Sequence, residues 1–250
     1  MSPDTLPTGG AEPAPIALAD GVGVLWQDAH LALVLKPSGM LSVPGRGPDK
    51  QDCLSARLAQ AGLPAWVVHR LDQATSGLML FAHSAEMQRQ LSLAFAQRQV
   101  HKQYLACVAG HLPASNDWQL IDAPIAADWP RRPLRIVADG GQSSQTLWCS
   151  LGPCMAQAPG QASIGSWLAL RPLSGRTHQL RVHLQYLGHP IWGDAMYAPT
   201  DVLARAPRLL LHAQRLALTH PATGRALAFE HTPTGWLSPD MLRRTQEMPW

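Results

Sequence analysis

Residues 67–84 read VVHRLDQATSGLMLFAHS, and this stretch holds the pattern that decides the fold. Its two apolar runs, VVHRL and GLMLFA, flank a short polar break and are typical of strands joined by a loop. The break carries Arg70, Asp72 and Thr75, although charged residues make up only 15% of the chain. Asp72 is either a turn aspartate that bonds nearby backbone or a reactive carboxylate on a loop held by two strands.

Apolar patterns on both sides of this stretch predict the remaining elements. The predicted strands lie in a hairpin over 21–41, at 77–82, 100–112, 145–152 and 166–175, and in a closing pair at 208–221 and 224–232. The predicted helices cover 52–62, 84–99 and 177–190. Residues 112–145 read as turn-rich and polar. Short hairpins with a few helices between them are typical of an α+β domain with a largely antiparallel sheet.

The domain organisation follows from the length of the chain and from its first residues. Residues 1–20 are rich in proline, glycine and alanine, which predicts a flexible tail. A chain of 250 residues can bury one sizeable core, and no repeat of fixed period divides this one. We therefore predict a single domain of catalytic size over 21–250.

Charge, cysteine usage and hydropathy narrow the class of protein. The net charge of +3 is compatible with a polyanionic partner. The cysteines show no CxxC pair and no metal-like spacing, so we expect reduced thiols at Cys53, Cys107, Cys149 and Cys154. The sequence has no secretory signal and no apolar run near the roughly 20 residues that span a bilayer. The chain is expected to be cytoplasmic and not bound to a membrane.

A second cluster of polar residues lies in RPLSGRTHQLRVHLQYLGHPIWGD, residues 171–194. Arg176, Thr177 and His178 begin the predicted helix, where free N–H groups and the helix dipole favour an anion. Arg181 lies at the edge of the apolar face of that helix. It either lies along the rim or points at a buried carboxylate.

The histidines of this cluster do not predict a metal site. His178 and His183 are five residues apart and lie on different faces of a helix, unlike the HExxH arrangement. His189 follows the predicted end of the helix. No metal is therefore expected there.

Two further stretches carry residues suited to RNA. WPRRPLR, residues 129–135, is either a solvated basic loop or a loop that grips phosphate, with Trp129 available to stack on a base. Its three basic residues are Arg131, Arg132 and Arg135. Tyr104 begins a predicted strand, with an apolar body and a hydroxyl that needs a polar surrounding.

Five stretches of the chain, taken in order, resemble the RluA-type pseudouridine synthases. They are KPSGMLSVPG, HRLDQATSGLMLFA, KQYLACVAG, SGRTHQLRVHLQYLGHPIWGDAMY and RLLLHAQRLALTHPATG. The resemblance covers about residues 21–236, and the HRLDxxTSGLxL pattern within it is highly specific. It implies a mixed, mostly antiparallel central sheet with flanking helices and an active-site cleft across the sheet.

The resemblance also assigns roles to single residues. Asp72 matches the essential aspartate of the family, and Arg181 matches the basic residue that pairs with it. Tyr104 matches the tyrosine that lines the uracil site, and Arg70 matches the arginine that helps to displace and hold the target nucleotide. Leu211 is expected in the apolar wall of the pocket. Further substrate contacts are expected at Thr75, Arg176, His178, Trp129, Arg131, Arg132 and Arg135, and no metal or other cofactor is required.

The predicted substrate is a stem-loop of 23S ribosomal RNA, of the tRNA anticodon arm, or of both. This follows from resemblance to a compact branch of the family without an N-terminal RNA-binding domain, and a monomer with no obligate protein partner is expected. Two rival functions stay open. One is a non-catalytic RNA-binding protein or RNA chaperone on the same fold. The other is a glycoside-type hydrolase, which needs a second carboxylate, and Asp194 is the candidate.

Overall fold

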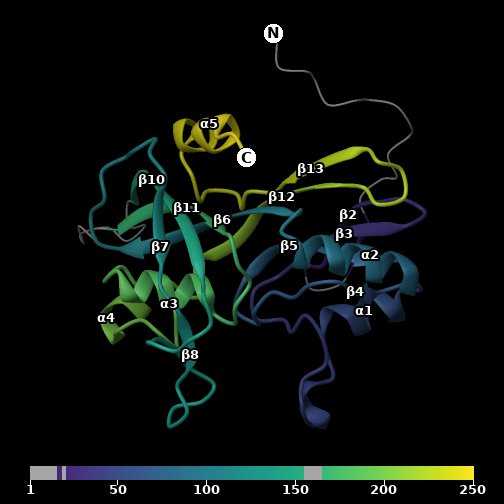
Figure 1. The fold of residues 1–250 in the computed structure, drawn as a ribbon, viewed down its shortest axis with the longest axis horizontal. Helices are drawn as coiled ribbons and strands as arrows, with labels where there is room; N and C mark the ends of the chain where they lie inside the picture. The colour runs from purple at the N-terminus through teal and green to yellow at the C-terminus, as the bar shows by residue number, and fades with distance from the viewer. Residues whose placement is uncertain (1–15, 19–20, 155–164) are drawn as a thin grey trace.

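The computed structural model describes residues 16–18, 21–154 and 165–250 (Figure 1). Most of the expected tail, 1–15 and 19–20, lies outside the described residues, as does most of the connection near 152–165. Strand β1, Ile16–Ala17, belongs to the expected tail but pairs with the first strand of the predicted hairpin. In the part of the chain that is described, no helix is long and apolar enough to cross a membrane.

The strands of the described residues form one large sheet and a small two-stranded ribbon. The large sheet has the order β1-β2-β3-β5-β12-β6-β11-β10-β7, with β13 also paired to β12 and β4 to β5. Its strands are β2 Gly23–Gln27, β3 Leu31–Lys36, β4 Trp66–Val67, β5 Ser76–Ala82, β6 His101–Ala109, β7 Gln119–Asp122, β10 Gln145–Cys154, β11 Gly165–Pro172, β12 Leu211–Thr219 and β13 Ala226–Glu230. Of the pairings between the described strands only β5 with β12 is parallel, which confirms the predicted mixed, mostly antiparallel sheet.

The described residues contain the three predicted helices and two further α-helices. The predicted ones are α1 Leu54–Gln60, α2 Ala85–Ala96 and α3 Gln179–Tyr186, and the further ones are α4 Thr200–Leu203 and α5 Pro239–Glu247. Ser84 caps α2 by accepting a hydrogen bond from the Met87 N–H. In Figure 1, α1 and α2 lie beside β3 and β5, α3 and α4 lie below β10 and β11, and α5 lies above them.

The prediction of a turn-rich segment over 112–145 was wrong in part. It contains β7 and the ribbon formed by β8, Ile125–Ala127, and β9, Arg135–Val137. These strands have only three or four residues, which is too short for an alternating pattern to stand out. Their apolar residues nevertheless reach the core, since Ile121 is 3% exposed and Ile125 is 4% exposed.

The parallel pair of β5 and β12 positions the loop that carries Asp72. His212 lies opposite Ser76, and Ala213 lies opposite Gly77. Gly77 has φ of +125°, and a Cβ there would lie 2.4 Å from the Ala213 backbone nitrogen. Only glycine permits this close approach, so Gly77 fixes where β5 enters the sheet.

All four cysteines are buried thiols, and none of them forms a disulfide bond. Among the described residues, no group of three or more potential ligands is arranged to hold a metal ion.

Acid should destabilise the fold through His69 and His212. Burial, aided by nearby positive charge, lowers the pKa of each imidazole to about 3. His69 Nε2 accepts a hydrogen bond from the Leu80 N–H, which requires an unprotonated nitrogen. The unfolded chain protonates both groups near pH 6.5, so it binds more protons than the folded chain between pH 6.5 and 3.

We therefore expect the free energy of unfolding to fall as the pH is lowered from 6.5, by roughly 1.4 kcal/mol per pH unit for each histidine. Urea titrations at pH 7 and pH 4.5 measure the fall. His212→Gln should lessen it, because glutamine does not titrate. An equal fall in wild type and His212→Gln would contradict this assignment.

Candidate active site

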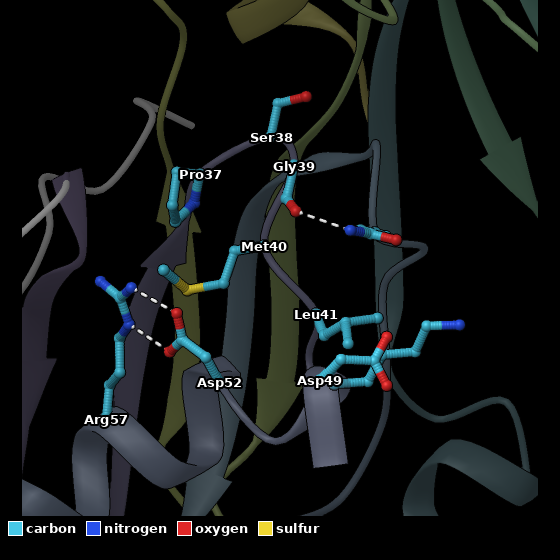
Figure 2. Close-up of a pocket in the computed structure, with 10 residues that line it drawn as sticks. Pro37, Ser38, Gly39, Met40, Leu41, Asp49, Asp52 and Arg57 are labelled. Carbon is cyan, nitrogen blue, oxygen red and sulfur yellow. Dashed lines mark hydrogen bonds and ion pairs between the residues drawn. The ribbon is translucent and has the colours of Figure 1, made fainter. Parts of the chain in front are cut away.

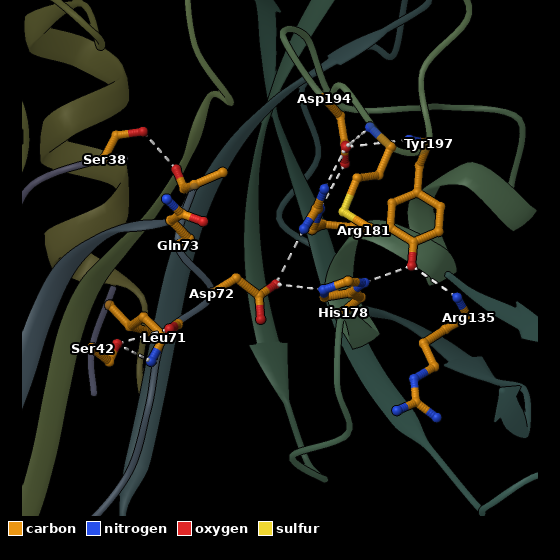
Figure 3. A network of polar contacts seen from close by, with 12 residues as sticks. Ser38, Ser42, Leu71, Asp72, Gln73, Arg135, His178, Arg181, Asp194 and Tyr197 are labelled. Atoms are coloured by element: carbon orange, nitrogen blue, oxygen red, sulfur yellow. Dashed lines mark hydrogen bonds and ion pairs between the residues drawn. The ribbon is translucent and has the colours of Figure 1, made fainter. Parts of the chain in front are cut away.

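Asp72 lies in the loop before β5, with its carboxylate facing the first turn of α3 (Figure 3). The turn itself is closed by backbone, because the Thr75 N–H donates to the Asp72 carbonyl at 3.0 Å. Asp72 Oδ2 lies 3.4 Å from Arg181 Nη1 and 3.9 Å from His178 Nε2. The side chain is 28% exposed, so it can still meet a ligand.

Arg181 is held by a second carboxylate beneath it. Its Nε and Nη2 donate to the two carboxylate oxygens of Asp194 at 2.8 and 2.6 Å. Arg181 is 3% exposed and Asp194 is fully buried, so Arg181 points at a buried carboxylate and the rim alternative is wrong. Burial lowers the pKa of the guanidinium, but the hydrogen bonds and charge of Asp194 and the charge of Asp72 raise it by more.

His178 is linked to the same centre through Tyr197. Its Nδ1 lies 2.6 Å from the Tyr197 hydroxyl, which accepts a hydrogen bond from the Arg135 backbone N–H at 3.0 Å. The hydroxyl and Nδ1 share this hydrogen bond, and the tautomer of the imidazole decides which of the two donates. Burial lowers the pKa of His178, although the charge of Asp72 opposes the shift. His178 is thus an uncharged neighbour of the carboxylate at neutral pH.

The helix start that was expected to bind an anion is only partly open. The helix begins at Gln179, later than the predicted start at residue 177, and His178 precedes it with a left-handed backbone at φ 57°. The Arg176 N–H, however, donates to the side chain of Gln179 at 3.0 Å. The Arg176 side chain is exposed and remains available to a ligand.

Lys36 supports the loop from below, and sequence reasoning missed it. The side chain is fully buried, and Nζ donates to the carbonyls of Pro37, Met40 and Gln73 at 2.9, 2.7 and 3.1 Å. Burial lowers its pKa to about 8, while the charge of Asp72 opposes the shift. The signal in the sequence was a lysine that ends the apolar strand LALVLK just before Pro37.

A cleft of about 1120 Å³ joins these residues to the rest of the predicted site. It is lined by Arg70, Asp72, Thr75, Tyr104, Arg176, His178, Arg181 and Leu211 from the predicted set, and also by Arg98, Lys102 and Arg171. Tyr104 and Leu211 come from the adjacent strands β6 and β12, so the cleft lies across the sheet as expected. Among the described residues that line it, Asp72 is the only carboxylate. A cleft with several cations and one carboxylate suits a polyanion.

The tip between β8 and β9 lies apart from this lining, because the cleft includes none of residues 129–135. Trp129 is 70% exposed and Arg132 stacks on it, with the guanidinium carbon 3.3 Å from the ring centroid. Arg131 forms an ion pair with Asp128 at 2.6 Å, so the acid just before this segment neutralises one of its arginines. The loop tip is a separate surface. It meets the residues around Asp72 through the Arg135 backbone N–H, which donates to the Tyr197 hydroxyl beside His178.

A smaller pocket of about 410 Å³ is lined by the loop at residues 37–41 (Figure 2). Its charged residues are Asp49, Lys50, Asp52 and Arg57, and Arg57 pairs with Asp52 at 2.7 Å. Two carboxylates make it a poorer place for phosphate than the cleft.

Comparison with known proteins identifies the family of the chain. The family model for RNA pseudouridylate synthase matches residues 30–186. The chain is 44% identical over 209 residues to the dual-specificity RNA pseudouridine synthase RluA of Yersinia pestis, covering 83% of this chain and 97% of that one. It is 43% identical over 209 residues to the protein of the same name from Escherichia coli strain K12, covering 83% and 91%.

Two solved human structures share the fold. RNA Pseudouridylate Synthase Domain Containing 1 superposes with a TM-score of 0.69 at 25% identity, over 91% of this chain and 86% of that one. Domain Containing 4 gives 0.64 at 26% identity, over 90% and 94%. The family model covers more than half of the chain, and relatives above 40% identity cover most of it. The chain therefore belongs to the RluA-type family of RNA pseudouridine synthases, a family of isomerases.

Proposed function

We propose that this chain isomerises uridine to pseudouridine in stem-loops of both tRNA and 23S ribosomal RNA, with Asp72 as the catalytic carboxylate. The observation that carries the proposal is Asp72 itself, the one carboxylate among the described residues of a cationic cleft, held against Arg181 at 3.4 Å. The curated relatives carry the name dual-specificity RNA pseudouridine synthase, which supports more than one RNA substrate. The protein would act in the cytoplasm as a monomer, through the domain over 21–250.

The reaction breaks the N1–C1′ glycosidic bond, turns the base, and joins C5 to C1′. Asp72 would act as nucleophile at C6 or C1′, or as the base that removes the C2′ proton. Each of these roles needs an oriented carboxylate, and Arg181, itself fixed by Asp194, supplies the orientation. The neutral imidazole of His178 lies beside the same carboxylate, with Nε2 3.9 Å from Asp72 Oδ2.

The remaining lining residues would hold the uridine after it leaves its stack. Unstacking a base costs a few kcal/mol, and the exposed Arg70 at the edge of the cleft can fill the vacated space. Tyr104 and Leu211 would form the apolar wall, with Thr75 beside Asp72 and Arg176 near the entering phosphate. Such a pocket needs no cofactor for this isomerisation.

Tyr104 should act through its ring more than through its hydroxyl. Burial and the charge of Asp72 raise the pKa of the phenol, so it stays protonated at working pH and cannot serve as a base. The ring packs against core clusters on both sides of the cleft. We expect Tyr104→Phe to keep the turnover rate within about ten-fold of wild type, and Tyr104→Ala to lower it by roughly 10² or more.

Single-turnover kinetics on a stem-loop RNA measure both Tyr104 variants. A phenylalanine variant as inactive as the alanine variant would show that the hydroxyl is essential and would reject this role for the ring.

The exposed loop at residues 129–135 should contribute affinity but little to chemistry. Each phosphate contact contributes about 0.7–0.9 to the slope of log affinity against log salt. Since Arg131 is already paired with Asp128, replacing Arg131, Arg132 and Arg135 by glutamine should lower the slope by about two. Trp129→Ala should weaken binding further by removing a stacking surface.

Binding titrations at several salt concentrations measure this slope. The matched control replaces three exposed arginines outside the cleft, Arg89, Arg225 and Arg243. Equal slopes for the loop variant and the control would mean that the loop does not grip RNA.

The proposed function is tested by mapping pseudouridine in RNA from cells that lack the protein. We expect sites in tRNA and in 23S rRNA to disappear, and to return with wild type but not with Asp72→Ala. Return with Asp72→Ala would favour the non-catalytic RNA-binding alternative. Release of free uracil would favour a hydrolase. A hydrolase of that type needs Asp194 as its second carboxylate, but Asp194 is fully buried against Arg181.

A further inference from the structure

Trp250 lines the same cleft as Asp72, although it lies outside the five stretches that resemble the family. The family match ends at residue 186, so α5 and Trp250 are beyond it. The indole is 40% exposed, whereas most large apolar side chains of the chain are buried. An exposed aromatic ring inside a cationic cleft calls for an explanation other than core packing.

The structure holds Trp250 in place from its covered side. The guanidinium carbon of Arg215 lies 4.3 Å from the indole centroid. Arg215 also donates to the carbonyls of Thr245 and Met248 at 2.9 and 3.2 Å, which ties the end of α5 to β12. Met248 is buried in the core. The position of the Trp250 ring is therefore set by the stacked Arg215 and also by the backbone at Thr245 and Met248, which Arg215 holds against β12.

The cleft that Trp250 lines also carries positive charge, from Arg98, Lys102 and Arg171. The Arg171 guanidinium lies 5.9 Å from the indole centroid and is fixed by two hydrogen bonds to Gln103, at 3.0 and 2.8 Å. Burial and the nearby Arg215 lower the pKa of Arg171 to about 10, so it is still a cation at neutral pH. The carboxylate of Glu230 lies 3.7 Å from Arg215 and is not part of the cleft lining.

We propose that Trp250 and Arg171, with Arg98 and Lys102, form a second nucleotide subsite in the cleft, where the indole stacks on an unpaired base near the target uridine and the cations bind its phosphates. Every base has a face that can stack on an aromatic ring, and stacking combined with a basic groove is the usual means of holding single-stranded RNA. The proposal deepens the proposed function and rests on it. Its consequence is a substrate loop held at two bases, one in front of Asp72 and one on Trp250.

A thermodynamic cycle between Trp250 and single bases of the RNA tests the subsite. The RNA is an anticodon stem-loop in which each loop nucleotide except the target is replaced in turn by an abasic residue. Binding is measured for the full chain carrying Asp72→Ala, so that no turnover interferes, with and without Trp250→Ala. In the Trp250-containing protein we expect one abasic position to raise Kd about ten-fold, and Trp250→Ala to raise Kd by a similar factor.

When the Trp250→Ala protein is combined with the RNA that is abasic at this position, the two losses of affinity should not add, because either change alone removes the stack. Trp250→Phe should restore most of the affinity, and the control Trp66→Ala, an exposed tryptophan outside the cleft lining, should leave Kd unchanged. Additive losses at every position, or Kd unchanged by Trp250→Ala, would overturn the subsite. The cycle needs binding only, so it decides the subsite independently of whether wild type forms pseudouridine in this RNA, which is the separate test of the proposed function.

Discussion

Replacing Asp72 by alanine or asparagine should abolish pseudouridine formation, with a loss of rate on the order of 10⁴ or more. Asp72 carries the only acidic side chain among the described residues of the cleft, so no second carboxylate side chain there can take over its role. Asparagine keeps the shape of the side chain and removes its charge, so it separates chemistry from packing. Single-turnover assays that follow pseudouridine in the RNA measure the loss.

Binding provides the control for the Asp72 variants. Removing a negative charge from a cationic cleft should leave RNA affinity unchanged or slightly stronger, because phosphate is no longer repelled. Asp52→Ala, which removes a carboxylate from the smaller pocket, should keep full activity. Product formation by Asp72→Ala at a rate near wild type would reject Asp72 as the catalytic carboxylate.

Arg181→Met should have the largest effect on stability, lowering the free energy of unfolding by about 3–5 kcal/mol. The variant leaves the fully buried Asp194 without the guanidinium that donates to both of its oxygens. In a domain of this size the loss corresponds to a fall in Tm of roughly 6–20 °C. Activity should be lost as well, because Asp72 loses the partner that orients it.

Two further variants separate these effects. Asp194→Asn combined with Arg181→Met should recover part of the stability, because no buried charge is left, but none of the activity. Arg181→Lys keeps the positive charge but lacks the bidentate geometry of the guanidinium. We expect its stability in urea and its turnover rate to lie between those of wild type and Arg181→Met. Stability of Arg181→Met equal to wild type would mean that the buried ion pair contributes nothing to the fold.

The sequence alone predicted those helices and strands whose apolar pattern and end residues lie within one short stretch of chain. The hairpin over 21–41, the strand after the Asp72 loop and helices α1 to α3 were predicted because each shows a clear apolar period and a turn or cap at its end. The convergence of Asp72, Tyr104, Arg181 and Leu211 on one cleft was predicted only through family resemblance. Their roles in the reaction stay predictions until the variants are measured.

The parts that sequence reasoning missed depend on contacts between distant segments. Asp194 as the partner of Arg181 could not be read from a helix pattern, since the pair forms only when the chain after α3 folds back. The three carbonyls around Lys36 come from two separate loops. Helix α5 has a polar sequence in which only Thr245 is buried, so its docking depends on partners such as Arg215 that no local period reveals.

The parallel pairing of β5 with β12 also has a consequence for synthesis of the protein. Ser76 and His212, which meet in that pair with Ser76 Oγ 2.8 Å from His212 Nδ1, are separated by 136 positions. Ribosomes add about 5–20 residues per second, so β5 waits roughly 7 to 27 seconds for its neighbour. During that time the chain has the Asp72 loop but lacks β12 and with it the Leu211 wall. A nascent or truncated chain that ends before β12 therefore has no complete cleft and should not modify RNA before its synthesis is nearly finished.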